Sequence, residues 1–97
     1  MFKTPKSLKS IDVLGIPVKI VIDPNTENMG EYRNGCIVLR PEYEDGADFV
    51  NTLVHETMHA HLHHVGLQLD LQLEEVIVTA TERLYTSITK KLNQVLK

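Results

Sequence analysis

The sequence contains a single cysteine, Cys36, no tryptophan, and only two phenylalanines and three tyrosines. One cysteine excludes an intrachain disulfide, and with it the class of small secreted domains that disulfides hold together. No apolar run reaches the length of a membrane-spanning helix, and none of signal-peptide length follows the basic N-terminus. These absences predict a cytoplasmic protein with no membrane partner.

The chain also has little excess of charge of either sign, since its formal net charge is −3. A chain without a basic field is not attracted to phosphate backbones, so we expect no nucleic-acid partner.

The 97 residues are 42% apolar and 24% charged, which is typical of one globular domain spanning residues 1–97. The first ten residues are polar and basic and contain Pro5, which indicates a lead-in whose order the sequence leaves open. The oligomeric state is left open.

Strand patterns occupy the first half of the chain. Apolar β-branched residues alternate with other residues from Ile16 to Ile22, which predicts a strand over about residues 16–23. The dipeptide Asn34-Gly35 favours a two-residue turn, because both residues accept positive φ. It predicts a hairpin with arms Gly30–Arg33 and Cys36–Arg40. The expected sheet has three strands and is mostly antiparallel.

Helical periodicity dominates the second half. Apolar residues recur at helical spacing from Val50 to Val65, with Asp48 as the expected N-cap and Gly66 placed to end the helix. A second apolar stripe predicts another helix from about Asp70 to Leu96. Strands followed by helices indicate an α+β domain in which the sheet packs on both helices.

The first predicted helix carries the sequence His-Glu-Thr-Met-His at residues 55–59. Residues four apart lie on one helical face, so His55 and His59 can present two imidazoles to one metal ion. A zinc ion with such ligands keeps a position for water and lowers its pKa to about 7. Glu56 has the residue type and position of a general base for that water. The pattern predicts a zinc site, with Zn²⁺ as cofactor.

A catalytic zinc needs a third protein ligand. A second helix that returns antiparallel to the first brings its first turn, with Glu74 and Glu75, back to the level of the histidines. Helix phase places Glu74 within the apolar stripe, so we predict Glu74 as the third ligand and Glu75 as a solvated residue. A one-residue change of phase exchanges these roles.

The remaining histidines, His61, His63 and His64, are expected to form a polar and partly exposed helix end. The elongated metzincin pattern requires glycine and histidine at positions 62 and 65, where this chain has Leu62 and Val65. That class is therefore excluded. His63 is four residues beyond His59, but one straight helix does not easily surround an ion with three histidines.

The segments Thr52–Ala60, Glu74–Val78, Gly30–Tyr32 and Cys36–Leu39 together resemble the small gluzincin-like metallopeptidases of the ImmA/IrrE kind and their compact phage-encoded relatives. The resemblance covers about residues 16–90, and only its His-Glu-x-x-His part is highly specific. It implies that His55 and His59 are ligands, that Glu56 is the general base, and that a glutamate of the second helix completes the site. Many relatives carry Asp or Asn four residues after that glutamate. A match by Thr79 would favour Glu75.

The function expected from these residues is that of a zinc metallopeptidase, a hydrolase acting on a peptide or protein substrate. We expect the substrate to bind extended along a hairpin edge, with Cys36–Arg40 as the preferred strand beside the metal and Gly30–Arg33 as the alternative. Tyr32, His63 and Tyr85 are candidate donors to the oxyanion.

Two other interpretations were weighed against the metallopeptidase. Peptide deformylases share the histidine motif and use a cysteine ligand, but their glycine-rich motif is absent, so Cys36 is expected to be a small buried residue. The remaining alternative is a zinc-binding or vestigial interaction module without peptidase activity.

Overall fold

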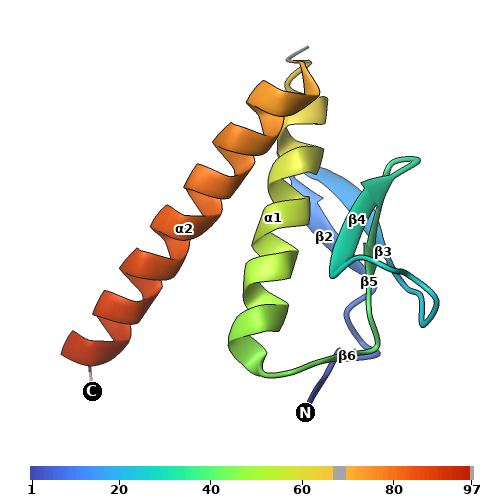
Figure 1. Ribbon diagram of the computed structural model, residues 1–97. Coiled ribbons are helices and arrows are strands. Elements are labelled where there is room, and N and C mark those ends of the chain that lie inside the picture. Colours follow the sequence, from blue (N-terminus) through green and yellow to red (C-terminus); the bar gives the residue numbers. More distant parts are fainter. Residues whose placement is uncertain (67–69, 97) are drawn as a thin grey trace.

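The computed structural model describes residues 1–66 and 70–96 (Figure 1). It is an α+β structure with a mixed sheet and two long helices. The first helix, α1, lies between the sheet on one side and the second helix, α2, on the other. The fold class agrees with the sequence expectation. Within the described residues, however, α1 is the helix that packs on the sheet, and α2 packs on α1.

The main sheet has four strands rather than the predicted three. In chain order these strands are β2 (Ser10–Val13), β3 (Ile16–Ile22), β4 (Gly30–Arg33) and β5 (Cys36–Leu39). Their spatial order is β2-β3-β5-β4, with β3 and β5 parallel and the other two pairs antiparallel. The sheet is thus mostly antiparallel, as predicted. The predicted hairpin is present, and it makes β4 an edge strand and β5 a central one.

The additional strand β2 joins β3 through a two-residue turn at Leu14 and Gly15, both of which have positive φ. A leucine is an unusual residue for the left-handed region, because its Cβ crowds the backbone there. The turn therefore lacks the Asn-Gly signal that marks the β4–β5 hairpin. This explains why the sequence pattern did not reveal β2.

The first residues are ordered, which is one of the two outcomes that the sequence left open. Strand β1 (Phe2–Lys3) pairs antiparallel with β6 (Glu42–Tyr43). The buried Thr4 donates a hydrogen bond from Oγ1 to the Arg40 carbonyl at 2.6 Å. The ring of Phe2 packs on Phe49, with ring centroids 4.9 Å apart. These contacts attach the N-terminus to the start of α1.

The hydrophobic core lies between the sheet and α1. It is formed by large apolar residues of β2, β3 and β5 together with residues of α1 and Tyr43: Val13, Val18, Ile20, Ile37, Leu39, Tyr43, Phe49 and Ala60. Strand β5 is central, and Ile37 and Leu39 have no exposed surface. Ala60 also has none, so its small side chain allows the backbone of α1 to approach the sheet closely.

Helix α1 (Gly46–His64) begins one turn earlier than predicted. Its N-cap is Asp45 and not Asp48, because the Asp45 carboxylate accepts a hydrogen bond from the Asp48 backbone N–H at 2.8 Å. This bond satisfies one of the free N–H groups of the first turn. The predicted end is confirmed, since Gly66 has φ +75° directly after the cap residue Val65.

Helix α2 (Leu71–Val95) begins after the N-cap Asp70, as predicted. Among the described residues of this helix, only Val78 is fully buried. Near the C-terminal half, Thr86 donates a hydrogen bond to the Asn51 side chain of α1 at 2.7 Å. Within the described residues, no helix combines the length and the apolar character needed to cross a membrane.

Candidate metal centre

Two histidines of α1 form the base of the site. His55 and His59 are one helical turn apart, with ring centroids separated by 5.1 Å. Their side chains are 22% and 13% exposed, so both rings are largely covered while retaining access to solvent. The i, i+4 spacing therefore places both imidazoles on one face of α1, as the sequence predicted.

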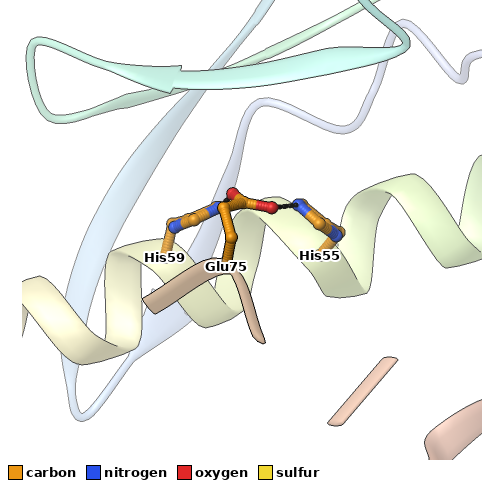
Figure 2. Close-up of side chains that lie close together, drawn as sticks. All are labelled: His55, His59 and Glu75. Carbon is orange, nitrogen blue, oxygen red and sulfur yellow. Dashed lines mark ion pairs between the residues drawn. The ribbon is translucent and has the colours of Figure 1, made fainter. Parts of the chain in front are cut away.

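The carboxylate of Glu75 completes a three-residue group with these histidines (Figure 2). One of its oxygens, Oε1, lies 2.6 Å from His59 Nε2, and the other, Oε2, lies 3.5 Å from His55 Nε2. Glu75 thus reaches the Nε2 atoms of both rings. One ligand atom from each residue lies within 4.8 Å of the others, so His55, His59 and Glu75 can hold a metal ion.

The predicted third ligand, Glu74, lies on the other side of His59. Its Oε2 is 2.6 Å from Nδ1 of the same ring. The prediction assumed that the apolar stripe of α2 faces α1, but the residue of α2 buried beneath α1 is Val78. Glu74 and Glu75 flank the line of the helix that passes through Val78, so each can reach His59 from a different side. The geometry favours Glu75 over Glu74 as a member of the metal-binding group.

A third carboxylate, that of Glu82, lies 3.8 Å from His55 Nδ1. Both histidines therefore have a carboxylate beside Nδ1 and share Glu75 beside Nε2. Sequence reasoning missed Glu82, although the signal was present. Residues 75 and 82 are seven apart and lie two turns apart on one face of a helix.

Glu56 lies on α1 next to His55 and is only 7% exposed. Burial raises the pKa of its carboxyl above the ordinary value, and the nearby His55 and His59 oppose that rise. An adjacent strand covers the side chain, because a Cβ built on Gly30 of β4 would lie 3.3 Å from Glu56 Cγ. The buried carboxyl is therefore held between α1 and β4.

A groove of about 760 Å³ runs past these residues. Its floor is α1 with His55, Glu56 and His59, one wall is the start of α2, and the other wall is residues 28–32. The strand beside the groove is β4, so the sequence preference for Cys36–Arg40 as the edge strand was wrong. The alternative, Gly30–Arg33, is the edge.

The register of β4 decides which of its backbone groups face the groove. Arg33 and Cys36 close the two-residue hairpin, and Gly30 pairs with Leu39. Hydrogen-bonded and non-hydrogen-bonded pairs alternate along an antiparallel ladder. Starting from the closing pair, the N–H and C=O groups of Glu31 and Arg33 point to β5. Those of Gly30 and Tyr32 point to the free edge.

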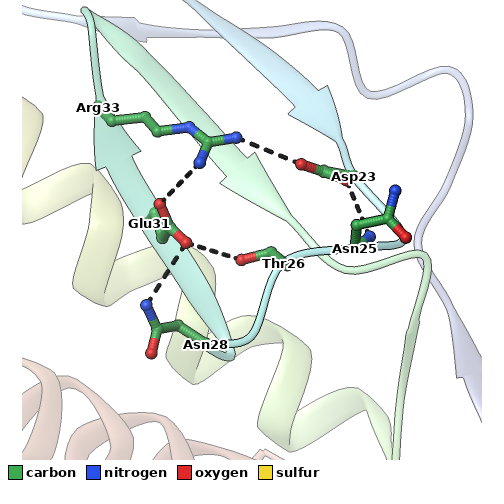
Figure 3. A network of polar contacts seen from close by, with 6 residues as sticks. All are labelled: Asp23, Asn25, Thr26, Asn28, Glu31 and Arg33. Carbon is green, nitrogen blue, oxygen red and sulfur yellow. Dashed lines mark hydrogen bonds and ion pairs between the residues drawn. The ribbon is translucent and has the colours of Figure 1, made fainter.

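A polar network holds the rim of the groove (Figure 3). The Glu31 carboxylate accepts hydrogen bonds from Thr26 at 2.8 Å and from Arg33 at 3.2 Å. Arg33 also forms an ion pair with Asp23 at 3.2 Å. These contacts tie the edge strand to the end of β3 and engage the Glu31 carboxylate outside the histidine group.

The other residues singled out in the sequence are not in the metal-binding group. Cys36 is partly buried in β5. The imidazole of His63 lies tilted beside the Tyr32 ring, with ring centroids 6.0 Å apart, and His64 Nδ1 is 3.5 Å from the Val13 carbonyl oxygen. Tyr85 lines a different cavity, near the start of α1.

Of the three candidate oxyanion donors, only Tyr32 lines the groove. Its hydroxyl is buried and has no hydrogen-bond partner among the residues that the structure describes.

His61 is partly exposed near the end of α1, where a polar helix end was expected.

Comparison with known proteins gives no relative. No protein-family model, no curated protein and no solved structure matches this chain.

Proposed function

We propose that this chain is a zinc-dependent metallopeptidase that hydrolyses peptide bonds in the groove between β4 and the two helices. The observation that carries the proposal is the convergence of the two Nε2 atoms and the Glu75 carboxylate beside the buried Glu56. This arrangement provides three metal ligands and a separate carboxyl group in one open groove. It agrees with the resemblance to the small gluzincin-like metallopeptidases.

His55, His59 and Glu75 would hold the zinc ion. Ligand atoms about 2.0–2.2 Å from a tetrahedral zinc are separated by roughly 3.3 Å, and Glu75 lies 2.6 and 3.5 Å from the two Nε2 atoms. The donor set therefore fits zinc in type, and the Glu75 carboxylate would move about 0.7 Å away from His59 Nε2 to reach that spacing. Glu74 can accept the Nδ1 proton of His59, which keeps the Nε2 lone pair directed at the ion. Glu82 lies 3.8 Å from His55 Nδ1, beyond hydrogen-bond distance, and would have to approach to do the same for that ring.

When bound, zinc would polarise the scissile carbonyl and lower the pKa of a water molecule to about 7. Glu56 would accept the proton of the attacking water on a carboxylate oxygen and pass it to the leaving amine. A carboxyl whose pKa is raised by burial is a stronger base than an exposed one, and this matches the role of Glu56.

The free edge of β4 would bind the substrate as an additional antiparallel strand. Gly30 and Tyr32 would offer their N–H and C=O groups to the main chain of an extended peptide. Such contacts are independent of side chains, so we expect broad sequence specificity. Tyr32 is the candidate oxyanion donor that lines the groove, and its buried hydroxyl would have to turn toward the substrate to act in this role.

A second candidate is a zinc-stabilised interaction module without peptidase activity. One observation favours it: α2 buries only Val78, so the histidine and glutamate contacts provide much of its attachment to α1. A metal ion that links the two helices would contribute to stability whether or not the site is catalytic.

The deciding experiment combines metal analysis with a hydrolysis assay on fluorescein-labelled casein. A metallopeptidase should contain one zinc per chain and release fluorescent peptides, while Glu56→Gln should retain zinc and lose hydrolysis. Zinc without hydrolysis in the wild type would favour the interaction module. Protein that binds no zinc after purification or on titration would contradict both functions.

A further inference from the structure

The groove beside the metal-binding group carries a local excess of negative charge. Among the described residues that line it, no lysine or arginine occurs, and six residues bear carboxylates: Glu31, Asp48, Glu56, Glu74, Glu75 and Glu82. The whole chain has a net charge of only −3, so this excess belongs to the groove and not to the composition. A cleft lined by charge of one sign attracts ligands of the opposite sign.

Asp48 is a carboxylate of this groove that has no partner. Its hydrogen bonds with described residues all use its backbone N–H and carbonyl, and its side chain forms no ion pair with them. The Glu31 carboxylate, by contrast, is engaged by Thr26 and Arg33. The partly buried Asp48 side chain is therefore free to receive a cation from outside the described chain.

Glu82 supplies a second carboxylate near Asp48, from the opposite wall of the groove. It lies on α2, 3.8 Å from His55 Nδ1, and its side chain is 24% exposed. One turn further along α2, Thr86 donates a hydrogen bond to Asn51 of α1 at 2.7 Å. Glu82 is thus level with the turn of α1 between Asn51 and His55, and Asp48 lies one turn before Asn51. Both walls are negative at this end of the groove.

Two buried polar groups indicate that the groove receives a ligand. Glu56 is only 7% exposed and accepts no hydrogen bond from the described residues. The Tyr32 hydroxyl is buried and is likewise without a partner among those residues. Both side chains line the groove. Polar groups buried in this way lose free energy unless a ligand or water satisfies them.

The direction of β4 decides which side of a bound peptide reaches Asp48. Gly30, at the start of β4, lies against Glu56 of α1. Tyr32 lies beside His63, two turns further along α1. Strand and helix therefore run in the same direction (Figure 1). A peptide paired antiparallel with β4 runs opposite to α1, so its C-terminal side points to the first turns of α1, where Asp48 lies.

We propose that the groove prefers peptides with a lysine or arginine two or three residues after the scissile bond. The proposal rests on the proposed function, because it takes the substrate to be a peptide paired with β4 and cleaved at the metal centre. Asp48 lies two turns before His55, about 10 Å along α1, and an extended peptide advances about 3.3 Å per residue.

A cationic side chain at that distance would form charge-assisted hydrogen bonds with Asp48, and Glu82 would add attraction from the other wall. Main-chain pairing with β4 leaves the other positions of the peptide unrestricted. The preference therefore concerns one end of the groove.

The first test measures binding without hydrolysis, in the Glu56→Gln background, with zinc and with a chelator. The probes are short fluorescein-labelled peptides of alanine and serine that carry a single arginine, glutamine or glutamate. Fluorescence anisotropy should show that the arginine peptide binds about 10-fold more tightly than the glutamine peptide, and that the glutamate peptide binds most weakly. Added salt should reduce these differences.

Asp48→Asn should remove most of the preference for arginine. Glu44→Gln is the matched control, because it removes the same charge at an exposed position outside the groove and should keep the preference. Circular dichroism checks that both variants keep the wild-type helix content. Glu82→Gln, which should also lower the preference, keeps the proposal testable if Asp48→Asn does not fold. Equal binding of the three peptides, or equal effects of Asp48→Asn and Glu44→Gln, would overturn the proposal.

The second test maps cleavage sites by mass spectrometry after the wild type digests a mixture of unstructured peptides. Lysine and arginine should be enriched at the second or third residue after the cut, and Asp48→Asn should lower this enrichment. Cleavage without enrichment there, or with enrichment before the cut, would overturn the proposal and leave the peptidase function standing. Absence of cleavage, together with binding of the arginine peptide that depends on Asp48, would contradict the peptidase function and support the charge preference of the groove.

Discussion

Gly30 provides a direct test of how closely β4 approaches α1. A Cβ added there would lie 2.6 Å from Thr52 Cγ2, 3.2 Å from the Val38 carbonyl oxygen and 3.3 Å from Glu56 Cγ. The first distance is shorter than van der Waals contact allows, so Gly30→Ala must displace the Thr52 side chain, β4 or α1. Overpacking of this kind costs about 1–3 kcal/mol. For a domain of about 100 residues, each kcal/mol lowers the melting temperature by about 4–8 °C.

The Thr52 methyl group is the principal obstacle, and a double-mutant cycle can isolate it. Thr52→Ser removes Cγ2 but keeps the hydroxyl, which donates to the Asp48 carbonyl at 2.9 Å. Alone it should cost about 1 kcal/mol for the lost methyl group. Combined with Gly30→Ala it should recover about 1 kcal/mol or more relative to the sum of the two single effects. Thermal and urea unfolding of the four proteins measure this coupling.

Gly35 supplies the control for the cycle. Its φ is +75°, and no atom lies within 4 Å of an added Cβ. Gly35→Ala should therefore cost about 1–2 kcal/mol through backbone strain alone, and Thr52→Ser should not rescue it. The reasoning fails if Gly30→Ala unfolds at the wild-type temperature, or if Thr52→Ser restores both alanine variants equally.

Three further predictions follow from the site and the core. Glu75→Ala should weaken zinc binding by at least about 10³-fold, and Glu74→Ala by only about 10-fold, because Glu74 contacts Nδ1 of His59 and not Nε2. Zinc titration against a competing chelator measures both effects. The reverse order of the two affinities would contradict this assignment. In the metal-free protein, Glu56→Gln should raise stability relative to wild type increasingly as the pH rises above 4.5. Burial raises the pKa of the Glu56 carboxyl in the folded state, so the wild-type protein loses stability as this carboxyl ionises, and the glutamine variant does not. A difference in urea unfolding between the two proteins that does not change with pH would refute this. Tyr43→Phe should lower the free energy of unfolding by about 1–3 kcal/mol. The buried hydroxyl donates to the Met29 carbonyl at 2.6 Å and accepts from the Arg40 N–H at 3.0 Å, and phenylalanine leaves both groups without this partner. An unchanged thermal unfolding temperature would argue against this role.

Local signals in the sequence were sufficient for most of the secondary structure. Alternating β-branched residues indicated β3, and Asn34-Gly35 indicated the hairpin, because positive φ is a property of those two residues and their turn. Helical spacing indicated α1 and α2 and placed His55 and His59 on one face. The strand β2 was missed, since Leu14 gives no turn signal.

The order of the strands could not be read from the sequence. A hairpin can join a sheet by either arm, and burial of β5 beside β3 decides that β4 is the free edge. The ordered N-terminus has a similar origin, because Phe2 and Thr4 find their partners only after the chain has returned at β6.

The metal centre shows most clearly which features follow from the sequence and which depend on tertiary packing. The sequence determined that His55 and His59 would share a face of α1, with Glu56 beside them, because residues four apart lie on one face of a helix with 3.6 residues per turn. Which glutamate of α2 meets them depends on how α2 is rotated about its own axis, and the apolar stripe suggested a rotation that the structure does not adopt. Val78 packs beneath α1, the stripe faces outward, and Glu75 reaches both Nε2 atoms. Only the tertiary packing decided this, because a helix with one buried residue and an exposed apolar face does not reveal which of its sides another helix will cover.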